Sequence, residues 1–418
     1  MRTAVAGVIV FASVGMSLAA CSTGGSSGPN PARAVPAAVH PAAVPPARGG
    51  VRRTASVPSC SGLGTGAFVG GGFDNVADGA YSGVLEGNSN QVCDESSSIG
   101  GGYSNFISSG QNSSYYSFIG AGYGNSISEY GDQSFIGGGN DNALTAANSV
   151  IGGGNKNTLT ATESVIVGGS GNAIYSGALY GFIGAGTNNS VSGEGAYIAA
   201  GGYNTASGEG AVVDGGFNSS ASGNFATIPG GYRNSAAGIY SFAAGAYATA
   251  AQTGTFVWSD GSHGSTALSS TRAYEFLARA SGGFTFYTNA ASTVGAQLSS
   301  GSGSWASLSD RNAKTNVAPL NVSGILAKLD ALPISRWSYK TEHGVRHVGP
   351  MAQDFYAAFG VGEDDRHITS IDEDGVALAA IKALHAENAA LRRRLASDEA
   401  HERRVEAELS AVVRATRR

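Results

Sequence analysis

Charge is scarce in this sequence. Only 13% of its 418 residues are Asp, Glu, Lys or Arg, and the formal net charge at pH 7 is -5. No tract of basic residues forms the electrostatic footprint of a nucleic-acid-binding protein, so we expect no nucleic-acid partner. Glycine, in contrast, is abundant at 64 residues, and the hydrophobic fraction of 42% is too high for simple disorder. This combination is far from that of an average soluble enzyme and indicates a repetitive fold.

Residues 1–20 are predicted to be a signal peptide. An apolar run extends from Ala4 to about Val14, which is shorter than the roughly 20 residues that a membrane-spanning helix needs. The small residues that follow end in Leu18-Ala19-Ala20-Cys21, which resembles a bacterial lipobox. The resemblance implies that the thiol of Cys21 is diacylated, so that the mature protein is exported and anchored to a membrane by lipid. The alternative is an ordinary secretory signal in which Cys21 is incidental.

Two features follow from export. Residues 21–59 are rich in Pro, Ala, Gly and Ser without apolar periodicity, which predicts an extended, disordered linker behind the lipid. Cys60 and Cys93 are the only other cysteines, and a disulfide persists in exported regions. We therefore expect Cys60 and Cys93 to pair. The alternative is two unpaired small core residues.

A short repeat occupies residues 60–251. An apolar residue is followed by small residues, mostly Gly, and then by Asn six positions later, with a spacing between repeats of 14 to 20 residues, most often 15. The pairs are Val69/Asn75, Val84/Asn90, Ile99/Asn105, Ile119/Asn125, Ile136/Asn142, Ile151/Asn157, Ile166/Asn172, Ile183/Asn189, Ile198/Asn204, Val212/Asn218 and Ile228/Asn234. This length is too short for a helical hairpin but accommodates one coil of two short strands and two turns. The repeat predicts a parallel β-solenoid whose single chain buries little core, so association is expected.

The repeats resemble the head repeats of trimeric autotransporter adhesins, for example over Asn204–Phe217. The resemblance implies a left-handed parallel β-roll made of three chains, a homotrimer, although the membrane barrel of those adhesins is missing here. Three other interpretations are weaker. A calcium-binding roll needs period nine and regular Asp, an ice-binding solenoid needs a Thr array, and the Gly-rich Gly62–Gly66 is a weak match to a dinucleotide loop.

Residues 252–308 lose the period and contain short strand-like runs separated by Ser and Gly, resembling the shaft of phage-type fibres. A different set of motifs then begins. They are Ser309-Asp310-Arg311-Asn312-Ala313-Lys314, Leu332–Tyr339, His347–Asp354 and Asp372–Ile381. Together they resemble the endosialidase-type intramolecular chaperone, a self-cleaving Ser-Lys peptidase family of phage tail spikes and other trimeric fibres. Many members have Arg-Leu in place of Asn312-Ala313 and Phe-Ile in place of Pro350-Met351.

The resemblance assigns roles within a chaperone domain at residues 309–380. It implies that Ser309 is the nucleophile, that Lys314 is its general base and that the bond between Leu308 and Ser309 is cut. A lysine, with a reference pKa of about 10.4, becomes a base near neutral pH only when burial lowers its pKa toward roughly 7 to 8. An offset of five separates the two side chains on a regular strand or helix, so the chain must bend between them.

The C-terminal residues 381–418 predict a coiled coil. Its heptad positions are Ile381, Leu384, Asn388, Leu391, Leu395, Asp398, Glu402, Val405, Leu409 and Val412. Asp398 and Glu402 weaken the middle of this seam. His343 and His347 lie four apart, but Gly344 and the lack of a third ligand favour surface residues over a metal site, and we expect no metal and no cofactor.

The sequence thus predicts a mainly β fibre with a C-terminal α+β chaperone domain ending in a coiled coil. The first functional hypothesis is a lipid-anchored homotrimeric fibre at the cell surface that binds a glycan or matrix protein and is matured by one self-cleavage. The second is a phage-derived tail fibre or receptor-binding protein with the same chaperone. A glycan-degrading enzyme is a third hypothesis, and the repeats offer no paired acidic residues for it.

Overall fold

A computed structural model of the protein describes residues 60, 62–108, 115–322 and 324–417. The predicted signal peptide, Cys21 and the whole linker at residues 21–59 lie outside these residues. The described chain is mainly β, as the sequence predicts, and its helices belong to the C-terminal part that follows the fibre. Among the described residues, no helix combines the length and the apolar character needed to cross a membrane.

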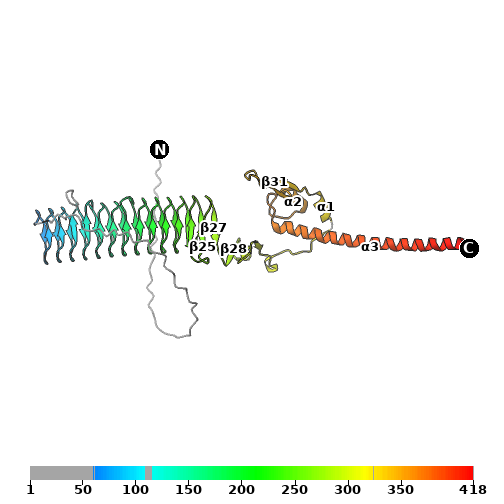
Figure 1. Cartoon of the computed structure of the whole chain (residues 1–418), viewed down its shortest axis with the longest axis horizontal. Coiled ribbons are helices and arrows are strands. Elements are labelled where there is room, and N and C mark those ends of the chain that lie inside the picture. Colours follow the sequence, from blue (N-terminus) through cyan, green and yellow to red (C-terminus); the bar gives the residue numbers. More distant parts are fainter. Residues whose placement is uncertain (1–59, 61, 109–114, 323, 418) are drawn as a thin grey trace, which may run out of the picture. The chain divides into compact units, whose positions relative to one another are not determined.

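A parallel β-solenoid forms the first part of the described chain (Figure 1). One sheet contains fourteen strands, the odd-numbered β1 to β27, and the other contains thirteen, the even-numbered β2 to β26. The first sheet consists of β1 (Phe68–Val69), β3 (Gly83–Val84), β5 (Ser98–Ile99), β7 (Phe118–Ile119), β9 (Phe135–Ile136), β11 (Val150–Ile151), β13 (Val165–Ile166), β15 (Phe182–Ile183), β17 (Tyr197–Ile198), β19 (Val212–Val213), β21 (Thr227–Ile228), β23 (Phe242–Ala246), β25 (Phe256–Asp260) and β27 (Phe276–Arg279). The second consists of β2 (Val76–Ala77), β4 (Gln91–Val92), β6 (Phe106–Ser108), β8 (Ser126–Ser128), β10 (Ala143–Leu144), β12 (Thr158–Leu159), β14 (Ala173–Ile174), β16 (Ser190–Val191), β18 (Thr205–Ala206), β20 (Ser220–Ala221), β22 (Ser235–Ala236), β24 (Ala248–Ala250) and β26 (Leu268–Ser269).

Most coils are held by one inward side chain per strand and one buried Asn. In the coil that contains β11 and β12, Ile151 and Leu159 are fully buried, as is Asn157 between them. The Asn157 amide donates to the Gly153 and Gly169 carbonyls at 3.0 and 3.1 Å, and its Oδ1 accepts the backbone N–H of the next ladder residue, Asn172, at 3.0 Å. The stacked Asn side chains therefore satisfy backbone groups that a tight corner would otherwise leave unpaired.

Glycine is required where the corners approach most closely. Gly154 has a φ of 101°, and a Cβ there would lie 2.1 Å from the carbonyl oxygen of Gly169 in the next coil. Both the left-handed backbone and the contact exclude a side chain at this position. The Gly-rich composition follows from this corner, which recurs along the solenoid.

The structure differs from the sequence interpretation at two places in the repeat. The pair Val212/Asn218 is wrong by one position, because Val213 is the buried residue and Ser219 is the buried residue in the Asn row. The parallel coils also continue beyond residue 251, since β25 pairs in parallel with β23, and β27 pairs in parallel with β25. Longer strands and irregular loops conceal these last coils from a search for the 15-residue period.

A small antiparallel sheet follows the solenoid and consists of β28 (Gly283–Tyr287), β29 (Gly295–Ser299) and β30 (Ala306–Ser307). Asp260, the last residue of β25, accepts hydrogen bonds from the backbone N–H groups of Ser262 and Ser281. These bonds, led by that of Ser281, lower the pKa of the Asp260 carboxyl well below its usual value. The carboxylate thus fastens the last coils to the segment that enters the small sheet.

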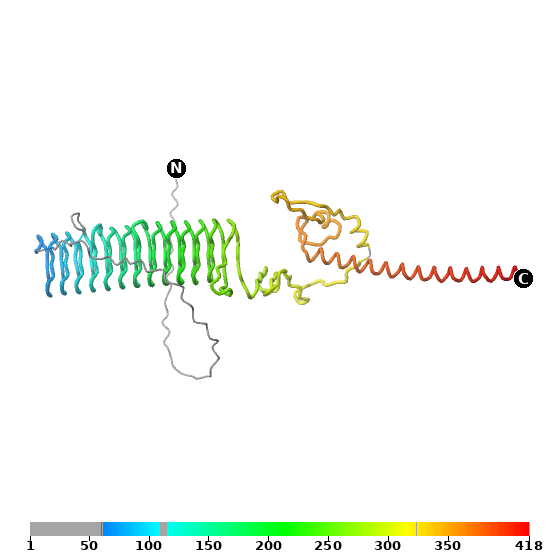
Figure 2. The backbone as a smooth tube through the Cα atoms, viewed as in Figure 1, coloured from blue at the N-terminus to red at the C-terminus, as the bar shows by residue number. Residues whose placement is uncertain are grey.

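The C-terminal part contains α1 (Ile325–Ala331), the hairpin β31 (Ser335–Trp337) and β32 (His347–Gly349), α2 (Ala352–Phe359) and the long α3 (Ser370–Thr416). Two small clusters hold these elements together, one with Ile325 against Ala379 and Ala380, and the other with Leu332, Phe355 and Val376. Beyond these contacts α3 continues as a bare helix, which Figure 2 shows as the red end of the tube. Its heptad side chains, including Leu384, Leu391, Leu395, Leu409 and Val412, are exposed in the single chain.

Candidate active site

The candidate cleavage position directly follows the small antiparallel sheet. Ala306 and Ser307 of β30 pair with Gln297 and Ala296 of β29. The backbone N–H of Leu308 then donates to the Gly295 carbonyl at 3.1 Å. The peptide bond between Leu308 and Ser309 therefore begins where regular pairing ends, and its two residues are exposed.

A short 3-10 turn, η1 (Arg311–Ala313), reverses the chain after Ser309. The Asp310 side chain accepts from the backbone N–H of Asn312 at 2.9 Å and from its amide at 3.1 Å, and the Lys314 N–H donates to the Arg311 carbonyl at 3.2 Å. Asp favours such turns because its short side chain can bond to the backbone two residues on. The bend that the five-residue offset demands is thus present.

The turn brings the two sequence-predicted side chains into contact. Nζ of Lys314 donates to Oγ of Ser309 at 2.6 Å, which is within the range in which a base and a nucleophile exchange a proton. All residues from 301 to 321 are exposed in the single chain. The Ser309–Lys314 pair is thus joined by a hydrogen bond and open to solvent in the single chain.

Apolar side chains flank the dyad along the sequence and lie open to solvent. Trp305 is 57% exposed, Val317 is 69% exposed and Leu320 is 65% exposed. Apolar side chains gathered along one exposed segment are typical of a surface that another chain covers. Covering this segment would also remove water from Lys314.

A cavity in the described C-terminal part lies apart from the Ser309–Lys314 pair. It has a volume of about 260 Å³, and its lining includes Leu320, Ile325, Lys328, Phe359 and Val376. Neither Ser309 nor Lys314 belongs to the lining. The cavity and the Ser309–Lys314 pair are therefore separate features of the C-terminal part.

The histidines that the sequence analysis considered form a different cluster. Nε2 of His347 lies 3.0 Å from Oε2 of Glu342, and its ring packs against Trp337 and Tyr339 with centroid distances of 4.6 and 5.7 Å. His343 is exposed and, in the part of the chain that the structure describes, makes no hydrogen bond, ion pair or ring contact with this cluster. Among the described residues, no group of three or more His, Cys, Asp or Glu is placed to hold a metal ion.

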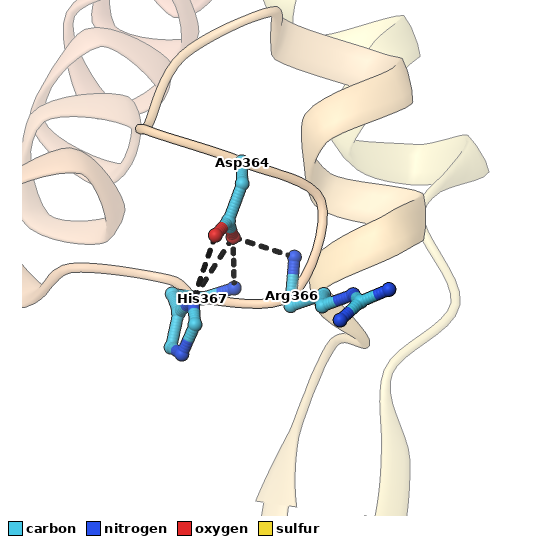
Figure 3. Close-up of polar contacts among 3 residues, drawn as sticks. All are labelled: Asp364, Arg366 and His367. Atoms are coloured by element: carbon cyan, nitrogen blue, oxygen red, sulfur yellow. Dashed lines mark hydrogen bonds and ion pairs between the residues drawn. The ribbon is translucent and has the colours of Figure 1, made fainter. Parts of the chain in front are cut away.

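One residue that the sequence analysis missed organises the start of α3. Oδ1 of Asp364 accepts from the backbone N–H groups of Arg366 and His367 at 2.8 and 2.9 Å, and both carboxylate oxygens contact Nδ1 of His367 (Figure 3). The N–H of Arg366, together with the His367 contacts, lowers the pKa of the Asp364 carboxyl. The sequence signal that could have identified Asp364 is the Asp-rich stretch before Thr369. The hydroxyl of Thr369 then caps α3 by accepting from the N–H of Asp372.

The remaining predicted site residues are the cysteines. Cys60 and Cys93 form a disulfide with a Cα–Cα distance of 5.6 Å, which ties the start of the described chain to the coil that contains β4. Cys21 lies outside the described residues, so its lipidation stays a prediction.

Comparison with known proteins agrees with the C-terminal motifs. Residues 309–361 match the family model described as chaperone of endosialidase, which is a family of self-cleaving chaperone domains. The match begins at Ser309 itself, the first residue of the dyad, and covers η1, α1, the hairpin and α2. No curated protein matches the chain. The resemblance found from the sequence motifs is thus confirmed for this segment, which follows a β-solenoid fibre.

Proposed function

We propose that this protein is an exported, lipid-anchored, homotrimeric surface fibre, adhesive in function, whose C-terminal domain chaperones trimer assembly and is released by self-cleavage before Ser309. The observation that carries the proposal is the hydrogen bond between Lys314 and Ser309 at the first residue of the segment that matches a self-cleaving chaperone family. A β-solenoid placed immediately before such a segment fits a tail-fibre-like protein.

The proposed reaction uses only groups of the chain and one water molecule. Lys314 accepts the hydroxyl proton of Ser309, and Oγ of Ser309 attacks the carbonyl carbon of Leu308. The bond to the Ser309 nitrogen breaks as that nitrogen takes a proton, which leaves an ester between the Leu308 acyl group and Oγ. Water then hydrolyses the ester, giving a Leu308 carboxylate and a free Ser309 with its amine and hydroxyl.

Enclosure by neighbouring copies supplies the missing activation. In the single chain the dyad is bonded but solvated, and an apolar segment around it is uncovered. When three copies associate, desolvation of Lys314 disfavours its charged form and allows it to act as the base. Cleavage then follows assembly, and the fibre left behind is kinetically trapped because the chaperone that assembled it has been removed.

A second candidate is a tail fibre or receptor-binding protein of phage origin, which the family match favours as strongly. The two proposals differ at Cys21. Intact-mass analysis of the protein purified from membranes of its natural host tests both. Diacylglyceryl on Cys21, a fragment beginning at Ser309 and a native mass of three chains support the lipoprotein fibre. An unmodified, secreted chain with the same cleavage would support the phage-type fibre, and an uncut monomer would contradict both.

A further inference from the structure

The outer surfaces of the two solenoid sheets differ in chemistry. We call the outward residues of the fourteen-stranded sheet the aromatic row and those of the thirteen-stranded sheet the polar row. The aromatic row is Phe68, Gly83, Ser98, Phe118, Phe135, Val150, Val165, Phe182, Tyr197, Val212, Thr227, Phe242, Phe256 and Phe276. The polar row is Val76, Gln91, Phe106, Ser126, Ala143, Thr158, Ala173, Ser190, Thr205, Ser220, Ser235, Thr249 and Ser269.

The aromatic row consists of Phe, Tyr and Val except at Gly83, Ser98 and Thr227. Neighbouring rings stack within the chain, most closely in the run Phe242, Phe256 and Phe276 with centroid distances of 4.6 and 4.7 Å. These side chains are not buried by their own chain. Phe118 and Phe135 in the middle of the solenoid remain 38% and 39% exposed, so an apolar surface runs along the whole sheet.

The neighbouring positions keep this surface smooth and uncharged. In each coil the residue that follows the inward one is Gly, Ala or another uncharged residue, with Asp214 as the exception. The row of isolated bridges at the corner after this sheet is mixed, since Tyr103 and Tyr123 are followed there by polar residues such as Asn140 and Asn155. Only the aromatic row is apolar along almost its entire length.

We infer that the aromatic row is the surface on which copies of this chain pack against one another, with the polar row facing solvent. The inference rests on the proposed homotrimeric fibre and specifies which face builds it. It is independent of the C-terminal helix, because it arises from the solenoid side chains.

The dimensions of the row identify the occupant as another copy. Fourteen strands at about 4.8 Å per coil make a strip of roughly 60 Å, which at about 10 Å wide offers on the order of 600 Å² per chain, close to the ~800 Å² per partner of a standard interface. An occupant must be as long as the solenoid and repeat at the same spacing. A copy of the solenoid in parallel register meets both conditions and places ring against ring at every aromatic level.

The absence of polar recognition groups argues in the same direction. The strands use their backbone groups in pairing between coils, so an extended peptide could not add to this face through its main chain. The row also presents no charged side chain to select an ionic ligand. What it offers is apolar area, whose burial gains about 25 cal/mol per Å² and is largest against an equally apolar surface.

The first experiment introduces lysines into either row of the full chain. The variant Val150→Lys/Val165→Lys alters the aromatic row, and Thr158→Lys/Ala173→Lys is the matched control, because it places the same pair of lysines on adjacent coils of the polar row with the same half-buried exposure. Native mass spectrometry over a dilution series is expected to show at least a tenfold rise in the trimer dissociation midpoint for the first variant and no comparable change for the second. Equal effects, or a larger effect of the control, would overturn the inference.

The second experiment maps the interface in the assembled protein, so it does not require a variant that remains folded after the copies dissociate. Thr227→Cys in the aromatic row is compared with Ser220→Cys in the polar row, both half-buried and on the successive strands β21 and β20. Mild oxidation is expected to link copies through Thr227→Cys and not through Ser220→Cys. Links through Ser220→Cys alone, in a protein that is trimeric, would place the interface on the other face and leave the proposed fibre intact. A monomeric wild-type protein would contradict the fibre proposal and this inference together.

Discussion

At the scale of single residues, the chain contains two side-chain arrangements that short local turns create. Ser309 meets Lys314 because Asp310 begins a 3-10 turn between them, and Asp364 gathers the backbone of Arg366 and His367 before α3. Both use an Asp that bonds to the backbone two residues on. The first positions reactive groups and the second positions a helix, so their substitutions should have different readouts.

Removing either member of the dyad should abolish cleavage without preventing assembly. Ser309→Ala lacks the nucleophile and Lys314→Ala lacks the base, whereas Ser307→Ala changes only an exposed residue of β30 and serves as the control. We expect intact-mass analysis to show a fragment beginning at Ser309 in the wild type and in Ser307→Ala, and an uncut chain in the other two. A cut Ser309→Ala chain would eliminate the dyad.

The Asp364 carboxylate should stabilise the C-terminal part in a pH-dependent way. Because its pKa is lowered in the folded chain, its contribution is present above the unfolded value of about 3.9 and is lost as the pH falls through the folded value. Asp364→Ala should therefore lower the melting temperature at pH 7 and make progressively less difference below about pH 4. Asp365→Ala is a neighbouring control. A difference between wild type and Asp364→Ala that grows on acidification would contradict this role.

At the scale of secondary-structure elements, the solenoid is a stack of short coils. The buried Asn side chains stacked along it, which we call the Asn row, tolerate substitution least. Asn157 is fully buried, so water cannot reach the backbone groups that bond to its side chain if that side chain is removed. The chain itself provides a comparison at Ser219, whose hydroxyl accepts the N–H of Asn234 at 3.2 Å in place of an Asn oxygen. The row thus requires an acceptor at each level more strictly than it requires Asn.

This distinction predicts an order of stabilities for substitutions at Asn157. Asn157→Ala leaves the buried N–H of Asn172 and the carbonyl of Gly153 without this partner, at a cost of about 1–3 kcal/mol for each group that water cannot reach, whereas the Gly169 carbonyl keeps the N–H of Asn155 at 2.8 Å. Asn157→Ser keeps an acceptor for Asn172 and should fall between Ala and wild type. Denaturant unfolding followed by circular dichroism measures the order, and equal loss in the two variants would count against it.

The coiled-coil seam should couple assembly to cleavage. Leu391 and Leu395 are each 60% exposed in the single chain, so they have no role in its own core. Leu391→Asp/Leu395→Asp should reduce trimer formation and also stop cleavage, although Ser309 and Lys314 are unchanged, because the dyad stays solvated. The control Arg392→Asp/Arg393→Asp changes charge beside the seam. Efficient cutting in a monomeric seam variant would show that enclosure does not activate Lys314.

The sequence predicted the elements that need the same residue types in every coil, and those that depend only on residues close together in the chain. The inward aliphatic residues and Asn positions were readable because each coil imposes the same period, and the bend after Ser309 was readable from the five-residue offset. The register at Val213 and Ser219 was not, because Val212 offers an equally good apolar residue and Asn218 an equally good amide. Asp364 was missed because its role lies in folded backbone geometry, which no spacing of side chains encodes.

At the scale of the whole molecule, the two parts of the chain form by different routes. The solenoid is built from pairings between coils and a thin core per chain, while the C-terminal part is helical, with local contacts that form rapidly. A helical segment that assembles first can set the register for a fibre that nucleates slowly. The order of synthesis places it last, so the fibre segment waits with its apolar face uncovered.

Deleting the C-terminal part should therefore prevent the fibre from forming. A chain ending at Leu308 should give aggregates or monomers, because the aromatic row is exposed before copies are aligned. The full chain, allowed to cleave itself, should yield a trimer that persists on heating after the fragment has gone. Sedimentation and thermal unfolding compare the two preparations, and heat-resistant trimers from the truncated chain would remove the chaperone role.

The disulfide has a consequence for how long the fibre can become. The strands at each end of a stack of similar coils have one edge without a partner. A strand of another chain could pair with such an edge and lengthen the stack. Here the leading end is occupied by its own chain, since Leu63 pairs with Ala77 and the Cys60–Cys93 bond clamps that segment in place. At the other end the last coil carries Arg272, Glu275 and Arg279, and the chain then departs into an antiparallel sheet. These features disfavour the addition of a foreign strand beside β2 and after the last coil, and they favour a rod whose length follows the number of encoded repeats.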